Sequence, residues 1–194
     1  MTHDSRNDAH LLWQEIERNT LVDTPVFSLV CSHRRAADQR EADYYVLESP
    51  DWANVVALTR DERDRECFLM VRQYRQGSMR VGLEFPGGVV DPGEDPVAAV
   101  ERELLEETGY RAAAIHRLGS VNPNPALMSN RCHTFLATDC RPAGKQELDA
   151  NEIIDVELVP TDELLNGSRS GEFDHAMMHV ALGFYREHLR QPRA

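Results

Sequence analysis

Three glutamates in the middle of the chain have the spacing of a metal-binding cluster. Glu103 and Glu107 are four residues apart and Glu106 follows Glu103 by three, so a helix would place them on adjoining turns. Carboxylates this close repel one another unless a hard cation lies among them, and Mg²⁺ prefers such oxygen ligands. The cluster therefore indicates a divalent cation site, while a solvated acidic helix face is the common alternative.

A helix that could position these glutamates has clear ends in the sequence. Asp95 is suited to cap its N-terminus, Pro96 to occupy its first position, and Gly109 to follow its last. The sequence therefore predicts a helix over residues 96–108. Its apolar residues recur at helical spacing and should form one buried stripe, made of Val97, Val100 and Leu104.

The residues on both sides of the cluster complete a longer pattern. Gly88 is followed after five residues by Glu94, and after seven more by Arg102-Glu103-Leu104, Glu106-Glu107 and Gly109-Tyr110. This arrangement resembles the signature of the Nudix hydrolases at every fixed position. The resemblance implies an α/β fold (an α+β mixed sheet), a sandwich in which a loop–helix–loop binds metal. It also implies hydrolysis of a phosphoanhydride bond.

The resemblance also assigns a role to each matching residue. The implied metal ligands are Glu103 and Glu107, with Glu106 alongside and the backbone carbonyl of Gly87 as a further ligand. Arg102 would orient the glutamates by ion pairing. The implied cofactor is Mg²⁺, for which Mn²⁺ could substitute, and it would neutralise charge on the diphosphate and acidify a bound water.

The family places the carboxylate that takes the proton from water outside this signature. In this chain the corresponding loop is QELDANEIIDV, and Glu152 matches a loop glutamate of the family. We expect Glu152 to be the general base. Glu147 and Asp149 are the alternatives, because a neighbouring position that is glutamate in some relatives is Ala150 here.

Residues 24–188 resemble one branch of the family, the hydrolases of ADP-ribose and nucleoside-diphosphate sugars. The segment VRQYRQG (71–77) precedes EFPGG (84–88) at the spacing of that branch, and Pro125 follows Tyr110 by fifteen residues. The residues expected to bind substrate are Arg75, Glu84, Pro125 and Arg131; Arg75 would grip phosphate. The products would be a nucleoside monophosphate and a sugar phosphate. The loop NPNPALMSNR (122–131) departs from the common pattern, so GDP-mannose stays open beside ADP-ribose.

The other expected elements form one compact α/β arrangement. Strands are predicted at 24–33, 43–48, 52–58, 67–74, 115–121, 132–138 and 153–158, and a second helix at 175–189, whereas 8–18 is interpreted as a lead-in. We divide the chain into an N-terminal helix/strand segment (1–50) and a Nudix domain (51–194). The early strands resemble a sheet that relatives exchange across a homodimer, so a homodimer is expected.

Composition narrows the possible partners and location. The chain has 194 residues with a net charge of −12, which argues against nucleic acid as a partner. No apolar run approaches the ~20 residues of a membrane span, and the start, MTHDSRNDAH, does not have the pattern of a secretory signal. The four cysteines form no CxxC pair and are expected to be reduced thiols. A cytoplasmic enzyme acting on a small nucleotide is therefore expected.

Two other functions remain to be distinguished from this one. The same chemistry could act on dinucleoside polyphosphates, damaged nucleoside triphosphates or capped RNA, although Pro125 and the early strands weigh against these substrates. A catalytically silent Nudix domain could instead sense a ligand. Silent members usually lack signature glutamates, and all of them are present here.

Overall fold

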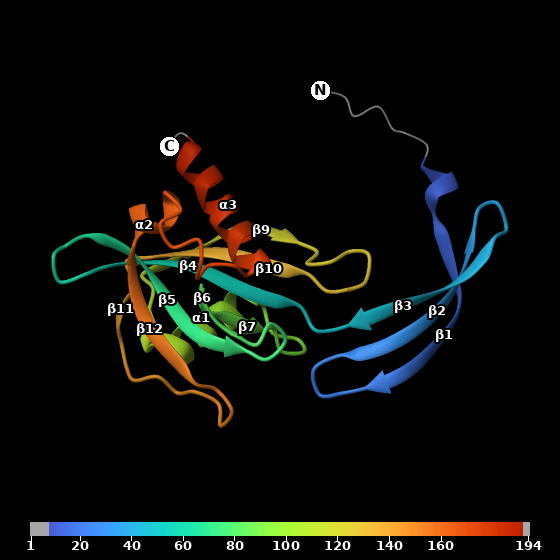
Figure 1. Ribbon diagram of the computed structural model, residues 1–194, viewed down its shortest axis with the longest axis horizontal. Coiled ribbons are helices and arrows are strands. Elements are labelled where there is room, and N and C mark those ends of the chain that lie inside the picture. Colours follow the sequence, from blue (N-terminus) through green and yellow to red (C-terminus); the bar gives the residue numbers. More distant parts are fainter. Residues whose placement is uncertain (1–7, 192–194) are drawn as a thin grey trace. The chain divides into compact units, whose positions relative to one another are not determined.

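The computed structural model describes residues 8–191, which fall into two compact units (Figure 1). The first contains the chain up to Ser49 together with Asn122–Asn130. The second contains Pro50–Val121 and the chain from Arg131 onward. Part of the segment MTHDSRNDAH, for which no secretory signal was expected, lies outside the described residues.

The first unit is a three-stranded antiparallel sheet in the order β1-β2-β3. A short 3₁₀ turn, η1 (Ala9–Leu11), precedes β1 (Trp13–Asp23), β2 (Ser28–Ala36) and β3 (Glu41–Glu48). The interpretation of residues 8–18 as a lead-in was wrong, because most of them belong to β1. This strand is exposed along almost its whole length, so its sequence lacks the alternation that marks a half-buried strand.

The loop 122–130 is joined to this unit through β3. Leu47 N–H donates to Leu127 O at 2.8 Å, and Ser129 N–H donates to Leu47 O at 3.2 Å. These two backbone bonds flank an isolated bridge between Leu47 and Met128. Two segments far apart in the sequence therefore build one unit.

The second unit is built on a mixed seven-stranded sheet. Five strands form the path β12-β5-β4-β10-β9, with β6 paired to β5 and β7 to β4. Their bounds are β4 (Trp52–Arg60), β5 (Glu66–Arg75), β6 (Arg80–Glu84), β7 (Gly87–Val89), β9 (Ala114–Val121), β10 (Cys132–Thr138) and β12 (Ile154–Pro160). β10 runs parallel to β4, and the other pairs are antiparallel. A separate two-stranded ladder joins β8 (Tyr110–Arg111) and β11 (Arg141–Pro142).

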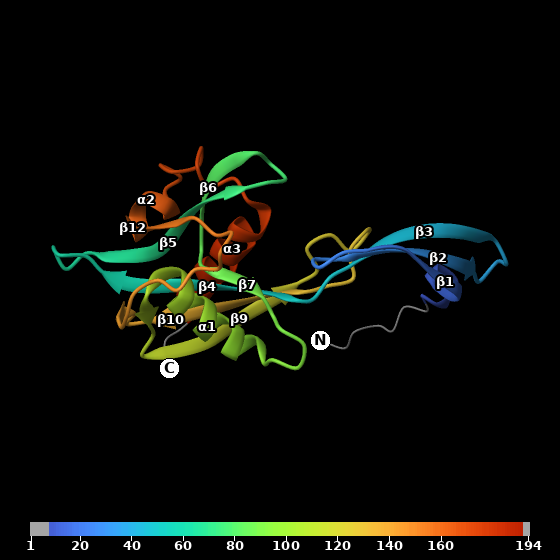
Figure 2. The ribbon, with the colours of Figure 1, turned by 90° about the horizontal axis from the view of Figure 1, so that it is seen from below.

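Helices cover both faces of this sheet, as Figure 2 shows for α1 and α3. The face towards α1 (Pro96–Thr108) buries Val55, Leu69, Val100 and Leu104 in one apolar cluster. The face towards α3 (Ala176–Arg190) buries a second cluster that contains aromatic rings, including Phe68, Phe85, Phe173 and Tyr185. The short helix α2 (Thr161–Leu165) adds Leu164 to it. The expected α/β sandwich with a mixed sheet is thereby confirmed.

The seven-stranded sheet opens between its central strands β4 and β5, near the residues expected to bind metal. β4 pairs with β5 only over Ala57–Arg60, and beyond this stretch β5 pairs with β6 and β4 pairs with β7. The chain crosses between these two central strands at residues 85–86, from Glu84 at the end of β6 to Gly87 at the start of β7. This opening brings Gly87 and Gly88 next to the helix α1.

The helix α1 has the predicted ends. Asp95 Oδ1 accepts a hydrogen bond from Val97 N at 2.9 Å, and Gly109 adopts a left-handed conformation at φ +72°. Val100 and Leu104 are buried while Val97 is partly exposed. Among the described residues, none of the helices has the length and apolar character needed to span a membrane.

Candidate active site

Two carboxylates of α1 converge on the backbone at Gly87 and Gly88. Glu107 Oε2 accepts a hydrogen bond from Gly87 N at 2.9 Å. A Cβ atom at Gly88 would lie 2.3 Å from Glu103 Oε1, and one at Gly87 would lie 2.2 Å from the carbonyl oxygen of Ala53. Neither position has room for a side chain. The two glycines therefore allow both carboxylates to approach the strand.

Burial disfavours the ionised form of these two carboxylates when no cation is bound. Glu107 is only 3% exposed, and burial raises its pKa to about 8, with the charges of Glu103 and Glu152 adding to the effect. Burial likewise raises the pKa of Glu103, and the neighbouring Glu106 and Glu152 charges raise it further. A hard divalent cation would offset this cost, because carboxylate and carbonyl oxygens are the donors it prefers.

The donor set is compatible with the expected magnesium ion. It combines two carboxylates on successive turns of α1 with the backbone at Gly87, the residue expected to supply a carbonyl ligand. Within residues 8–191, no group of three or more histidine, cysteine, aspartate or glutamate side chains is arranged so that it could hold a metal ion. Mg²⁺ does not need such a cage, since it usually keeps several waters and binds one or two carboxylates.

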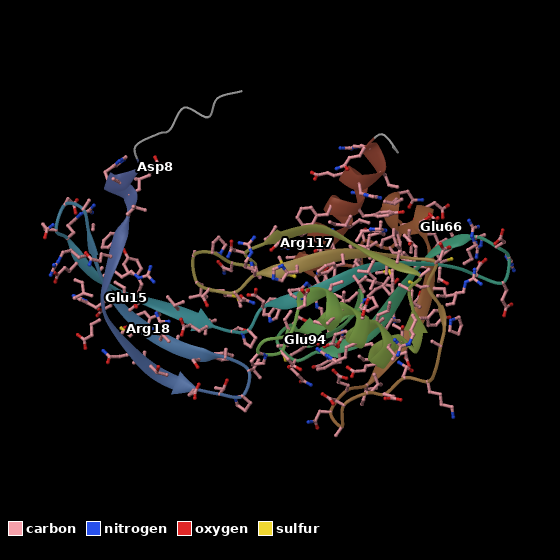
Figure 3. The ribbon with its side chains drawn as sticks, turned by 180° about the vertical axis from the view of Figure 1, so that it is seen from behind. Asp8, Glu15, Arg18, Glu66, Glu94 and Arg117 are labelled. Atoms are coloured by element: carbon pink, nitrogen blue, oxygen red, sulfur yellow. The ribbon has the colours of Figure 1, made fainter. Side chains whose placement is uncertain are left out.

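Arg102 holds the glutamates of this region in place. Its Nη1 donates to Glu103 Oε1 at 2.8 Å and to Glu106 Oε2 at 3.1 Å. Its Nε and Nη2 donate to Glu94 at 3.1 and 3.2 Å, and Nη2 also reaches Val89 O. Glu94, labelled in Figure 3, lies beside α1. These contacts raise the pKa of Arg102 and lower that of Glu94.

Arg75 and Glu84 form a two-point ion pair at the mouth of the opening. Arg75 Nε donates to Glu84 Oε1 at 3.0 Å and Nη2 donates to Oε2 at 2.7 Å. Glu84 is 1% exposed, and together with the charges of Glu107 and Glu152 it raises the pKa of Arg75. Among the described residues, Nη1 of Arg75 has no hydrogen-bond partner, so this edge of the guanidinium can bind an anion.

Arg72 lies elsewhere. It pairs with Glu172 and with Glu157, the latter at 3.4 Å. Among the two arginines of the VRQYRQG segment, Arg75 is therefore the one placed at the candidate site.

The loop before β12 carries Glu152 to the same region. Glu152 lies close enough for its charge to raise the pKa values of Glu103, Glu107 and Arg75. Its carboxylate accepts from Asp149 N at 3.1 Å. Gln146 ties the loop to α1, since its Nε2 donates to Glu107 O at 2.6 Å and to Ile154 O at 3.1 Å.

The alternative bases lie on the same loop and are exposed. Glu147 N donates to Glu106 O at 2.9 Å, which brings this residue beside the helix as well. Asp149 binds Glu152 through its backbone rather than through its carboxylate.

A cavity of about 550 Å³ lies beside Gly87 and Gly88, although Glu103, Glu107 and Glu152 themselves do not line it. Its lining includes Arg75, Glu84, Gly87 and Gly88 from the features above. The start of α3 supplies further walls, of which Asp174, His175, Met177 and Met178 are part. The volume falls within the usual range of small-molecule sites.

Two other expected residues are placed separately from the lining of this cavity: Pro125 belongs to the first unit, and Arg131 lies in the second unit without lining the cavity. Pro125 lies in the first unit, in a turn where Leu127 N donates to Asn124 O at 3.0 Å. Arg131 belongs to the second unit, where its Nε donates to Ser120 Oγ at 2.9 Å and its backbone N donates to Asp51.

One lining residue was missed from the sequence. Asn54 lies in the segment WANVVAL, which was noted only as a strand, yet this residue lines the cavity and is 3% exposed. A single amide within an apolar strand is the signal that could have drawn attention to it, because buried polar groups need partners.

The remaining candidate groups have structural roles. The four cysteines are free, and burial raises the pKa of Cys132 to about 11 and that of Cys140 to about 12. His175 caps α3 by accepting from Met177 N at 3.1 Å, and His179 packs edge-on against Phe173.

Comparison with known proteins agrees with this geometry. The NUDIX domain profile matches residues 50–179. The chain is 30% identical over 140 residues to the ADP-ribose pyrophosphatase of Bacillus subtilis (strain 168), covering 72% of this chain and 74% of that protein. It is 31% identical over 125 residues to the ADP-sugar pyrophosphatase of Mus musculus, covering 61% of this chain but only 56% of that protein.

A solved structure shares the fold. The crystal structure of an ADP compounds hydrolase superposes with a TM-score of 0.78 at 21% identity, covering 92% of this chain and 94% of that one. The residues that match the NUDIX domain include the opening between β4 and β5, the helix α1 and the residues that line the cavity. The chain therefore belongs to the Nudix family, as a pyrophosphohydrolase of the ADP-ribose pyrophosphatase branch.

Proposed function

We propose that the protein uses Mg²⁺ to hydrolyse the diphosphate linkage of ADP-ribose or a related nucleoside-diphosphate sugar. The products are a nucleoside monophosphate and a sugar phosphate. One observation carries this proposal: Glu103 and Glu107 converge on Gly87 and Gly88, and these two glycines line the same cavity as Arg75. The names of relatives support the substrate class, since they include ADP-ribose, ADP-sugar and GDP-mannose pyrophosphatases.

The residues of the site divide the work of a substitution at phosphorus. Glu103, Glu107 and the Gly87 carbonyl would hold the metal, with Glu106 beside them. Bound magnesium would supply positive charge against the diphosphate and help to activate water. Arg102 fixes the carboxylates through its contacts to Glu103 and Glu106.

The remaining groups act on the substrate and on water. Arg75 binds a phosphate oxygen through the guanidinium edge that faces away from Glu84. The ion pair with Glu84 fixes the orientation of this guanidinium. Glu152 takes the proton as the water oxygen bonds to phosphorus and the anhydride P–O bond breaks. Arg131 does not line the cavity and Pro125 belongs to the first unit, so both keep only the substrate role implied by resemblance.

A substrate panel tests the reaction. The full chain is incubated with Mg²⁺ and ADP-ribose, GDP-mannose, UDP-glucose or dinucleoside polyphosphates, and release of a nucleoside monophosphate is measured. We expect a sugar diphosphate to have the highest kcat/KM. Turnover confined to triphosphates or polyphosphates would refute the assignment to sugar diphosphates, and the absence of any turnover would support the silent-sensor alternative.

We also propose that the N-terminal segment up to residue 50 forms a homodimer interface. The first unit exposes many large apolar side chains, namely Leu11, Leu12, Ile16, Leu21, Val22, Val26, Phe27, Tyr44 and Tyr45. Apolar surface of this kind is typical of a protein interface. Sedimentation should give twice the 22.0 kDa mass of the chain, and a monomer at micromolar concentration would contradict this proposal.

A further inference from the structure

A buried amide in the wall of the cavity lacks a partner for its oxygen. Asn54 lies on β4 and is 3% exposed. Its Nδ2 donates to Cys132 Sγ at 3.5 Å, whereas its Oδ1 has no hydrogen-bond partner. A buried acceptor without a partner destabilises the folded protein, so such groups are rare unless a ligand completes them.

The surroundings of Asn54 connect the amide to the candidate active site. Asn54 pairs with Gly87 in the β4–β7 ladder, and Gly87 N–H binds the Glu107 carboxylate. Gly87 and Gly88 line the same cavity as Asn54, so a group bound beside Asn54 lies next to the place proposed for the diphosphate.

The rest of the wall around the amide is apolar. Trp52 and Cys132 come from the sheet, and Phe85, Met177 and Met178 complete this side. Phe85 N donates to Met178 Sδ at 3.1 Å, which ties the start of α3 to the strand connection at residue 85. Polar residues such as Glu84, Asp174 and His175 line other parts of the cavity, whereas this part offers the Asn54 oxygen among apolar side chains.

This combination fits a sugar better than a phosphate or a metal. A lone amide oxygen needs an O–H or N–H donor, and apolar side chains can pack on the C–H face of a sugar ring. In a nucleoside-diphosphate sugar, the group directly attached to each phosphate is a sugar. The hydroxyl nearest the diphosphate thus comes either from the terminal sugar or from the ribose of the nucleoside.

We propose that Asn54 determines specificity by accepting a hydrogen bond from a hydroxyl of the sugar that adjoins the diphosphate. This inference rests on the proposed function. The terminal torsion of an asparagine side chain has a broad energy profile, so a modest rotation turns Oδ1 towards a ligand in the cavity. Binding then completes a hydrogen bond that the protein alone leaves unmade.

Deoxy analogues of the best substrate test this contact. Purified wild type and Asn54→Val are assayed with the sugar diphosphate of highest kcat/KM, and with analogues that each lack one hydroxyl of either sugar. Asn54→Val should lower kcat/KM for the parent substrate by about 3- to 10-fold, the usual effect of one neutral hydrogen bond. With wild type, one analogue should have a kcat/KM lower than that of the parent substrate by the same factor. With Asn54→Val, that analogue should show no further loss of kcat/KM relative to the parent substrate.

The position of the sensitive hydroxyl identifies the bound sugar. Sensitivity on the terminal sugar assigns the cavity to that ring, and sensitivity on the nucleoside assigns it to the ribose. An equal loss on every analogue, or no loss at all, would overturn the role of Asn54. Failure of wild type to hydrolyse any sugar diphosphate would instead overturn the proposed function.

A stability measurement separates a binding role from a structural one. Removing a buried amide whose oxygen has no partner should raise the Tm of Asn54→Val by about 2–4 °C. Thr134→Val is the matched control, because Thr134 is buried opposite Asn54 on β10 but does not line the cavity. The control should leave the ratio of kcat/KM between substrates unchanged. A Tm several degrees lower in Asn54→Val would show a structural amide and contradict the proposal.

Discussion

Replacing Glu107 with glutamine removes a buried charge while preserving the shape of the side chain. The glutamine oxygen can still accept from Gly87 N, as the carboxylate does at 2.9 Å. In the metal-free protein, burial raises the pKa of Glu107 to about 8. This folded-state pKa lies above the unfolded value. The contribution of Glu107 to stability is therefore fully present below about pH 4.5 and is lost as the pH rises through 8.

The size of the effect follows from this shift. A pKa displaced from 4.5 to about 8 corresponds to roughly 4–5 kcal/mol, since one unit is worth about 1.4 kcal/mol. Glutamine does not titrate, so between pH 5 and pH 9 metal-free Glu107→Gln should gain this much stability relative to wild type. For a chain of this length, the gain corresponds to a change of about 10 °C or more in relative Tm.

Thermal melts in EDTA and in excess Mg²⁺ measure this directly. In EDTA, the Tm difference between Glu107→Gln and wild type should grow from pH 5 to pH 9. Mg²⁺ should raise the Tm of wild type at pH 9 but have little effect on the variant, which should also lack turnover. Glu101→Gln on the exposed face of the same helix is the control and should show neither change. A Tm difference that is equal at both pH values, or full activity in Glu107→Gln, would refute the metal-site reasoning.

Three further substitutions probe the rest of the site. Arg102→Ala removes contacts to Glu94, Glu103 and Glu106 and should weaken Mg²⁺ binding by about 10- to 100-fold, measured by calorimetry. Glu152→Gln should lower kcat by about 100- to 10,000-fold while Mg²⁺ still raises the Tm, because only the proton acceptor is lost. Gly88→Ala should abolish turnover, since its Cβ would collide with the Glu103 carboxylate.

Each of these has a control and a contradictory outcome. Unchanged Mg²⁺ affinity in Arg102→Ala would mean that the arginine does not position the ligands. A wild-type rate in Glu152→Gln would move the role of base to Glu147 or Asp149. Gly183→Ala, where a new Cβ meets no atom within 4 Å, should remain active, and equal activity in Gly88→Ala would exclude the close approach of Glu103.

The glutamate helix could be predicted closely because local chemistry fixes its ends. Asp95, Pro96 and Gly109 act within a few residues of the boundaries, so their meaning does not depend on the rest of the fold. The strand β10 (Cys132–Thr138) was predicted with the same bounds, since it is buried along almost its whole length.

Features that depend on exposure or pairing were harder to predict. The strand β1 is charged and exposed, and the short strands β6 and β7 are defined by their pairing on either side of the opening. The Arg75–Glu84 pair likewise depends on the hairpin register, which places Glu84 opposite Val71. The significance of Asn54 depends on its oxygen being buried without a hydrogen-bond partner, which is a property of the folded chain and not of the local sequence.

The first unit is assembled from two separate stretches of chain, and this has a consequence for biosynthesis. Leu47 exchanges backbone hydrogen bonds with Leu127 and Ser129, which emerge from the ribosome some eighty residues later. At about 5–20 residues per second, the edge of β3 therefore waits several seconds for these partners. Cutting the gene after codon 50 would leave the N-terminal sheet without them, so the sheet should be transplanted together with residues 122–130.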